Sequence, residues 1–261
     1  MSKDTKTPKT KEDFFGKPLN PAIEQLNSLV YWYPVLKQIR IPTPKTLIIY
    51  KGQCELGMLA DGQPPPSWDN FEKRLREAMD EIGYPCFLRT GQLANKHDWN
   101  NSCFIKDDKE SIKSHVANLV ETSFMANIAG DPVSFDFWVV REMLNTKPVF
   151  THFHGNMPIA REIRLFIKGG DIQCIHPYWP DEAFKDLDKP TKKKLKEIQK
   201  LPDKNHDVYK MAKYMARFFP GYWSVDFLED KNGKWWCTDM AVGSRSYHYP
   251  DCKKNGSIIS K

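Results

Sequence analysis

The sequence predicts an α+β fold of two lobes, in which antiparallel sheets are partly covered by helices. Two pairs of strand-like segments are joined by short Gly-containing turns, at 169–171 and at 231–233, which is typical of antiparallel hairpins. The helical segments do not alternate regularly with strands, as they do in doubly wound nucleotide-binding folds. The GxGxxG and GxxxxGK[ST] phosphate loops are also missing from the 261 residues.

The first third of the chain is predicted to contain a tail and an N-terminal lobe. Residues 1–13 carry almost no apolar side chains and are predicted to be a disordered tail. The lobe is expected over residues 14–66. Within it, residues 20–38 have apolar side chains at helical spacing, although Pro34 interrupts the pattern. The β-branched run 46–50 is predicted to be a buried strand.

A central subdomain is expected over residues 67–140, after the proline-rich segment 61–67. Its first element is a helix that Ser67 is predicted to cap and Gly83 to end. The remaining elements are predicted as a strand at 84–90, a polar loop at 91–101, a strand at 102–106, a helix within 109–128 and an apolar central strand within 135–144.

A C-terminal subdomain is expected over residues 141–248, followed by a loosely held tail at 249–261. Its predicted elements are a hairpin of strands 161–169 and 172–179, mostly helical residues 180–219, and a second hairpin of strands 222–230 and 234–242. The second hairpin carries an aspartate near the end of each strand.

Composition and charge indicate a soluble globular protein. Hydrophobic residues make up 40% and charged residues 28% of the chain, and the net charge is +6. Six cysteines occur without a CxxC pair, so their spacing predicts neither a zinc site nor a compact disulfide framework. No run of about 18 apolar residues exists, and the Lys-rich N-terminus lacks the apolar region of a secretory signal. A cytoplasmic protein without membrane contact is therefore expected.

The two aspartates of the last hairpin, Asp226 and Asp239, are candidate metal ligands. Apolar neighbours flank each of them, and Mg²⁺ is commonly bound by one or two carboxylates together with phosphates. Strand-end aspartates that cap turns or face Lys and Arg side chains are the alternative.

The strand REIRLFIKG has one apolar and one polar face. Alternation places Glu162, Arg164 and Phe166 on one face and the intervening Ile and Leu residues on the other. The Glu/Arg pair fits a solvent-facing salt bridge, which stabilises a fold little, and it fits equally an arginine that grips a phosphate in a cleft.

Two further segments carry residues suited to nucleotide binding. Arg89 leaves a buried strand and Lys96 follows in a polar loop, an arrangement that suits phosphate contacts as well as an ordinary exposed loop. The apolar strand before Glu142, Met143 and Leu144 either ends there as a core strand or presents its backbone to a flat base edge.

In this order, the four features resemble the ATP-grasp superfamily over about residues 40–248. The closest resemblance is to compact viral and phage-type members and to the eukaryotic initiation-factor assembly chaperones, which have a similar E-[IF]-R-x-F-[IV]-K-x-G strand. The opening IPTPKTLII is also similar to the strand that begins these proteins. The resemblance implies an ATP-grasp-like fold that binds ATP and Mg²⁺, in the cytoplasm or, for a viral protein, in the host cytoplasm.

The resemblance also implies a role for each motif residue. Arg89 and Lys96 would contact ATP phosphates, and Arg164 would contact the triphosphate. Glu142 would face the exocyclic amine of adenine while the backbone of Met143 and Leu144 reads the ring edge. Glu162 would serve the ribose or the metal. Asp226 and Asp239 would hold Mg²⁺.

This sequence departs from the family pattern at two positions. The Lys usual on the first phosphate strand is Arg89, and the Asn usual two residues after the last acidic ligand is Ala241. The second change removes an oxygen ligand from the expected second metal position, where Ser244 or a water is a possible replacement.

Three functions follow as hypotheses. The first is an ATP- and Mg²⁺-dependent ligase that joins a small-molecule or peptide carboxylate to an amine through an acylphosphate. In it, Arg164 and Lys96 would stabilise charge, and Arg245 with Tyr247 and His248 would recognise substrate. The second is a non-ligating ATP-binding assembly or partner-binding factor, which the loss of the Asn at 241 favours. The third is an ATP-dependent enzyme acting on nucleic acid, motivated by the basic charge balance.

Overall fold

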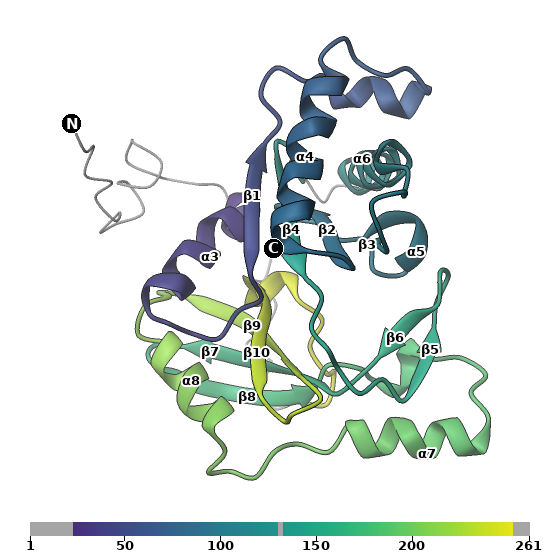
Figure 1. Ribbon diagram of the computed structural model, residues 1–261. Coiled ribbons are helices and arrows are strands. Elements are labelled where there is room, and N and C mark those ends of the chain that lie inside the picture. Colours follow the sequence, from purple (N-terminus) through teal and green to yellow (C-terminus); the bar gives the residue numbers. More distant parts are fainter. Residues whose placement is uncertain (1–22, 130–132, 253–261) are drawn as a thin grey trace.

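The computed structural model of the protein describes residues 23–129 and 133–252 (Figure 1). The predicted tail at 1–13, and all of the predicted tail at 249–261 beyond Cys252, lie outside these residues. Within them, no helix has the length and apolar character that would let it cross a membrane.

The first sheet has four antiparallel strands in the order β1-β4-β2-β3. These strands are β1 Thr46–Tyr50, β2 Cys86–Thr90, β3 Phe104–Ile105 and β4 Phe137–Glu142. The apolar run predicted to be a central strand is β4, which is buried on both faces. Trp138 and Val140 pack into one hydrophobic cluster and Val139 into another. The strand of the expected N-terminal lobe, β1, pairs with β4 in this same sheet. The boundaries of the lobes stay a prediction.

Helices cover the outer face of the first sheet (Figure 1). They are η1 Leu56–Asp61, α4 Trp68–Ile82, α5 Trp99–Ser102 and α6 Ile112–Ile128. The apolar face of α4 is fully buried at Phe71, Leu75 and Met79. The predicted cap at Ser67 is wrong in one respect: the helix starts after this residue, but its side chain makes no capping hydrogen bond. The ψ angle of Ser67 is 12° rather than extended, and capping side chains usually need an extended backbone.

The second sheet also has four antiparallel strands, in the order β10-β9-β7-β8. The strands are β7 Glu162–Lys168, β8 Asp171–Pro177, β9 Tyr222–Glu229 and β10 Trp235–Val242. Both predicted hairpins are confirmed. One face of this sheet packs on α3 Leu29–Gln38 and α8 Asp207–Met215 to form the largest hydrophobic cluster. The short helix α2 Ile23–Leu26 precedes α3 and is separated from it at Asn27 and Ser28.

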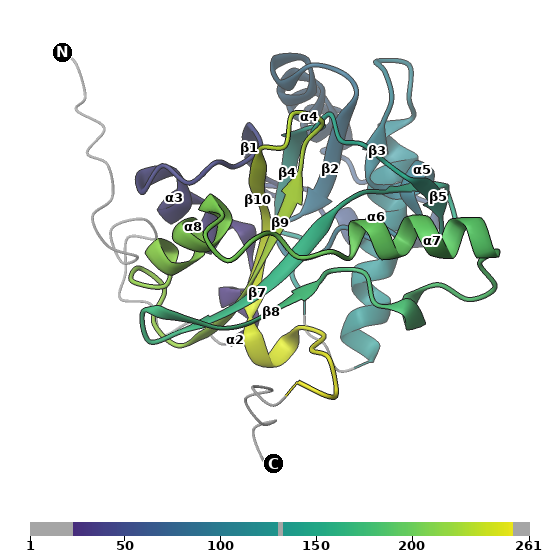
Figure 2. The same cartoon turned by 90° about the horizontal axis from the view of Figure 1, so that it is seen from below.

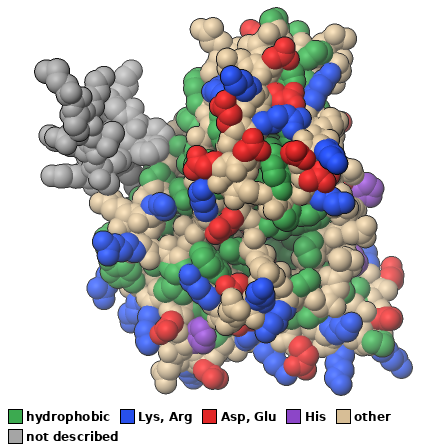
Figure 3. Space-filling model, viewed as in Figure 1, with side chains coloured by type: hydrophobic (Ala, Val, Ile, Leu, Met, Phe, Trp, Pro, Cys, Tyr) green, Lys and Arg blue, Asp and Glu red, His purple; other side chains and the backbone are tan. Residues whose placement is uncertain are grey.

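A third, smaller layer closes one side of the molecule. It consists of the hairpin β5 Phe150–His152 and β6 Met157–Ile159, the turn η2 Asp181–Ala183, and the helix α7 Lys189–Ile198. Trp99, Trp179 and Phe184 pack with this layer in a separate hydrophobic cluster. Figure 3 shows Lys and Arg side chains along the outer side of α7. The strand hairpin was not predicted, because its strands are only three residues long.

The fold class predicted from the sequence, antiparallel sheets partly covered by helices, is confirmed. The arrangement matters for the site because the second sheet turns one face toward α3 and α8 and the other toward the first sheet. Figure 2 shows the long β7–β8 hairpin beneath the β9–β10 hairpin.

Candidate active site

Three charged side chains lie side by side across the second sheet. In the strand register, Asp239 of β10 is opposite Asp226 of β9, and Asp226 is opposite Arg164 of β7. Residues paired in this way project from the same face of a sheet. Their face is the one that looks toward the first sheet, because the alternate residues Ile163, Leu165 and Ile167 lie in the hydrophobic cluster beneath.

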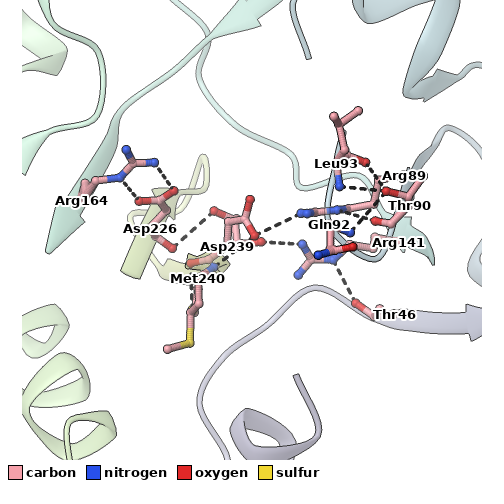
Figure 4. Close-up of polar contacts among 12 residues, drawn as sticks. Thr46, Arg89, Thr90, Gln92, Leu93, Arg141, Arg164, Asp226, Asp239 and Met240 are labelled. Carbon is pink, nitrogen blue, oxygen red and sulfur yellow. Dashed lines mark hydrogen bonds and ion pairs between the residues drawn. The ribbon is translucent and has the colours of Figure 1, made fainter. Parts of the chain in front are cut away.

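The first sheet supplies a cation that meets this row. Arg89 at the end of β2 is only 3% exposed, and its Nη1 lies 3.2 Å from Oδ1 of Asp239 (Figure 4). The expected confrontation of the hairpin aspartates with cations of an earlier part of the chain is therefore present. Although burial opposes ionisation, Arg89, Lys96 and Arg141 lower the pKa of Asp239, so this carboxyl group is ionised.

Arg164 and Asp226 form a two-point ion pair. Nε donates to Oδ1 at 2.7 Å and Nη2 donates to Oδ2 at 2.8 Å (Figure 4). The guanidinium also lies over the ring of Tyr178, 4.8 Å from its centroid. Burial disfavours the charged form of Arg164, but Asp226 outweighs it and raises the arginine pKa.

Lys96 and Glu162 lie beside this pair. The Lys96 ammonium is 5.2 Å from the centroid of the Tyr178 ring. Burial acts against its charge, yet Tyr178, Glu162 and the two aspartates raise the pKa of Lys96 above its usual value. Burial and the nearby Asp226 raise the pKa of Glu162 to about 7, although Lys96 and Arg164 oppose this change. The glutamate is therefore held close to the point at which it gains or loses a proton.

A cavity with about 750 Å³ of open space adjoins these charges. Such a volume is typical of sites that bind small molecules and cofactors. Glu142, Met143 and Leu144 all line it, as do Arg89, Lys96 and Glu162. Its apolar walls come from residues that the sequence did not single out, which are Phe87, Trp99, Met157, Trp179 and Leu228.

Arg141 is a site residue that sequence reasoning missed. It is 4% exposed, lines the cavity, and donates from Nε to Thr46 Oγ1 at 3.0 Å and from Nη1 to the Thr238 carbonyl at 2.6 Å. Its Nη2 is buried and has no hydrogen-bond partner among the described residues. Burial and the neighbouring Arg89 lower the pKa of Arg141 to about 10. The available signal was a charged residue inside an otherwise apolar central strand.

A family model described as an ATP-grasp domain, family 3 of its clade, matches residues 77–258, which is most of the chain. The chain belongs to this ATP-grasp family. No curated protein matches it in a sequence comparison.

Solved structures agree with the ATP-grasp fold at low sequence identity. Cdc123 from Schizosaccharomyces pombe is 14% identical, with a TM-score of 0.53 over 86% of each chain. A RimK domain ATP-grasp protein from Sphaerobacter thermophilus is 14% identical, with a TM-score of 0.43 over 84% of this chain and 59% of that one. The ATP-grasp ligase PsnB, complexed with a minimal precursor, is 10% identical, with a TM-score of 0.46 over 85% and 54%. The chain thus spans little more than half the length of these two proteins.

The donor groups of this ATP-grasp site fit a nucleoside triphosphate and Mg²⁺. Two carboxylates lie on paired strands, which suits a cation that prefers oxygen ligands. The four surrounding cations, Arg89, Lys96, Arg141 and Arg164, suit phosphate oxygens. The unpaired Nη2 of Arg141 is a buried donor without a described acceptor, as expected of a group that binds a ligand.

One predicted site residue lies apart from the others. Arg245 is exposed on the turn η3 Gly243–Arg245, after β10, and does not line the cavity. Ser244 is exposed on the same turn. Tyr247 is exposed too, but its carbonyl accepts a hydrogen bond of 3.3 Å from Nη1 of Arg164. Only the backbone of this segment therefore reaches the row of charges in the structure.

Proposed function

We propose that this ATP-grasp protein is an ATP- and Mg²⁺-dependent ligase that joins a carboxylate to an amine. The observation that supports it best is the pairing of Asp226 with Asp239 opposite Arg89, beside a cavity large enough for a nucleotide base. In the proposed reaction the substrate carboxylate displaces ADP from the γ-phosphate, and the amine then displaces phosphate from the resulting acylphosphate.

The cavity is the proposed adenine site. Met143 and Leu144 continue from β4 as it leaves the sheet, and Met157, Trp179 and Leu228 supply apolar surface for a flat ring. Glu142 lines the same space, where a carboxylate can accept a hydrogen bond from an exocyclic amine. These positions agree with the roles that the family resemblance implies for the segment 142–144.

The cations beside the cavity are the proposed triphosphate site. Arg89, Lys96 and Arg141 all line the cavity at the end where the charged row begins. Arg89 and Arg141 are held by the first sheet, so their guanidinium groups are positioned before a ligand arrives. Fixed cations of this kind stabilise charge that develops on phosphate oxygens.

Asp226 and Asp239 are the proposed Mg²⁺ ligands, with Glu162 as a further oxygen donor. Bound Mg²⁺ would neutralise phosphate charge and orient the phosphate oxygens. In the structure each aspartate is paired with an arginine, Asp226 with Arg164 and Asp239 with Arg89. Nucleotide binding would exchange these partners, so that phosphate oxygens meet the arginines and the carboxylates become available to the metal.

The test is ADP release by the intact chain with ATP, Mg²⁺ and pooled small-molecule or peptide carboxylates and amines. We expect release that needs both a carboxylate and an amine, and a condensed product that is lighter than the sum of its substrates by one water. Asp239→Asn is the inactive control, and Asp171→Asn, an exposed change at a turn, is the matched neutral one. ADP release that is independent of both substrates, without a condensed product, would contradict the ligase.

A non-ligating ATP-binding factor is the second candidate, and a specific observation favours it. Ala241 stands where the family has an Asn ligand, and Ser224, its partner on β9, donates to the Ala241 carbonyl rather than toward the row of carboxylates. The fold likeness to Cdc123, which extends over 86% of both chains, also fits this candidate. Tight Mg²⁺–ATP binding without turnover in the same assay would support it.

A further inference from the structure

Two cysteines and two histidines from distant parts of the chain meet at one edge of the second sheet. Cys174 and His176 are two residues apart on β8, so both project from the same face of this strand. His248 and Cys252 come from the segment after η3, which runs beside β8 (Figure 2). One ligand atom from each of the four side chains lies within 4.8 Å of the others. All four residues are half-buried.

The orientation of His248 is that of a metal ligand. Its Nδ1 lies 3.1 Å from the carbonyl oxygen of Tyr249, and a carbonyl only accepts, so Nδ1 carries the ring proton. The lone pair is then on Nε2, which is 3.1 Å from Sγ of Cys174. Histidines that bind metals usually donate their second ring N–H to a carbonyl or carboxylate in this way.

His176 supplies a second, independent observation. Its Nε2 is buried and makes no hydrogen bond with any described residue, although buried polar atoms are almost always paired. The ring is held in place by Tyr249, which stacks on it at 4.8 Å between centroids and 13° between planes. Burial and the adjacent His248 lower the pKa of His176 to about 4, so the ring is neutral at physiological pH. A neutral, buried and unpaired imidazole nitrogen is available to a cation.

We propose that Cys174, His176, His248 and Cys252 bind a zinc ion. Two thiolates and two imidazoles are a ligand set of structural zinc sites, and tetrahedral zinc places such atoms about 3.3–3.8 Å apart. The spread of 4.8 Å in the structure therefore needs contraction by about 1 Å, which side-chain rotation can supply. No described cysteine forms a disulfide. The cysteine spacing gave no sign of this site, because β8 and the C-terminal segment each contribute only one thiol.

The zinc would fasten the C-terminal segment to the open edge of the second sheet. β8 is an edge strand, and an uncovered edge is prone to pair with other chains. His176 is also the register partner of Arg164 on β7, and Arg164 donates to the carbonyl of Tyr247, one residue before His248. Zinc binding therefore fixes a backbone acceptor that holds Arg164. The site is independent of the proposed ligase activity, since none of its four residues lines the nucleotide cavity.

The experiment measures metal content on the intact chain, purified with a reductant and dialysed against buffer containing Zn²⁺. We expect one zinc per chain, and a Co²⁺-loaded sample with the intense visible bands of tetrahedral cobalt and a thiolate-to-cobalt charge-transfer band. Cys252→Ala, in a segment outside the hydrophobic clusters, should weaken zinc binding at least tenfold in competition with a chromogenic chelator. Cys54→Ala, which removes a buried thiol elsewhere, is the matched control and should bind zinc as the parent does.

Two results would overturn the proposal. One is a parent protein that retains less than a tenth of an equivalent of zinc, or a Cys252→Ala variant that holds zinc as tightly as the parent. The other is a Cys174–Cys252 disulfide that persists in the reduced preparation. Because the readout is metal content, failure here leaves the nucleotide site untouched, and failure of ATP binding leaves the zinc site untouched.

Discussion

Asp239 lies opposite Asp226 because Thr238 is an extra residue in β10. Cys237 pairs with Phe227 and Asp239 pairs with Asp226, so two positions of β10 span one step of β9. Without this bulge, strict alternation would turn Asp239 to the same face as Cys237, which is fully buried in the hydrophobic core. Bulges that re-aim a side chain are common next to active sites. The bulge also frees the Thr238 carbonyl, which accepts from Arg141.

The paired carboxylates predict a specific dependence on Mg²⁺. Asp226→Asn and Asp239→Asn should each weaken binding of ATP in the presence of Mg²⁺ by about tenfold or more, because a neutral amide is a weaker ligand for a hard cation. ATP affinity measured with EDTA should fall less, since the arginines remain. Titration calorimetry of each variant with ATP, with and without Mg²⁺, measures both values.

The control for this pair is Asp171→Asn at the β7–β8 turn, which removes a carboxylate of the same type outside the site. Its affinities should equal those of the parent. Equal losses with Mg²⁺ and with EDTA in the site variants would show that the aspartates act on the fold or the arginines and not on the metal.

Much of the second sheet could be predicted from the chain itself. Alternation along REIRLFIKG placed Arg164 on the polar face and its neighbours in the core, and the structure agrees. The turn at 231–233 identified the last hairpin, since Asn-Gly turns favour two paired strands. In both cases, local periodicity and turn chemistry determine the result, and no information about distant residues is needed.

The site needed information that local patterns lack. The bulge at Thr238 arises from pairing with β9, so a single strand does not reveal which residue is extra. Arg141 was overlooked because its partners Thr46 and Thr238 are 95 and 97 positions away along the chain. The contact between Cys174 and His248 spans 74 positions for the same reason.

The ion pair of Arg164 with Asp226 should stabilise the folded state as a unit. Removing one partner leaves a largely buried charge without its counterion, which typically costs about 3–5 kcal/mol. We expect Asp226→Asn and Arg164→Met each to lower the free energy of unfolding by about 2–4 kcal/mol. The double variant should lose clearly less than the sum. Urea denaturation of the four proteins gives the coupling energy, and additive losses would contradict the expectation.

Arg141 should contribute directly to nucleotide binding. Its Nη2 is a buried donor with no acceptor among the described residues, so a ligand oxygen is the expected partner. Hydrogen bonds to charged groups contribute about 1.5–3 kcal/mol, so Arg141→Met should weaken ATP binding about 10–100-fold. Arg141→Lys keeps the charge but not the planar donors and should recover only part of the loss. If ATP affinity in Arg141→Met equals that of the parent, Arg141 is a structural residue alone.

Glu162 should make the stability of the ligand-free protein decrease with rising pH. Burial raises its pKa from the ordinary 4.5 to about 7. Between these two values the folded protein holds a proton that the unfolded chain has lost, so the stability supplied by this group falls as the pH rises and stays low above pH 7. Glu162→Gln removes the titration.

The variant should therefore be more stable than the parent at pH 8, by up to about 3 kcal/mol, and the difference should shrink toward zero at pH 4.5. Chemical denaturation of both proteins across this range, without nucleotide, measures the difference directly and cancels the groups that both proteins share. A difference that grows as the pH falls would have the opposite sign and would mean that Glu162 is ionised and favourably paired in the folded protein. Adding ATP and Mg²⁺ should reverse the order at pH 8, because the ionised glutamate then has a cation to bind.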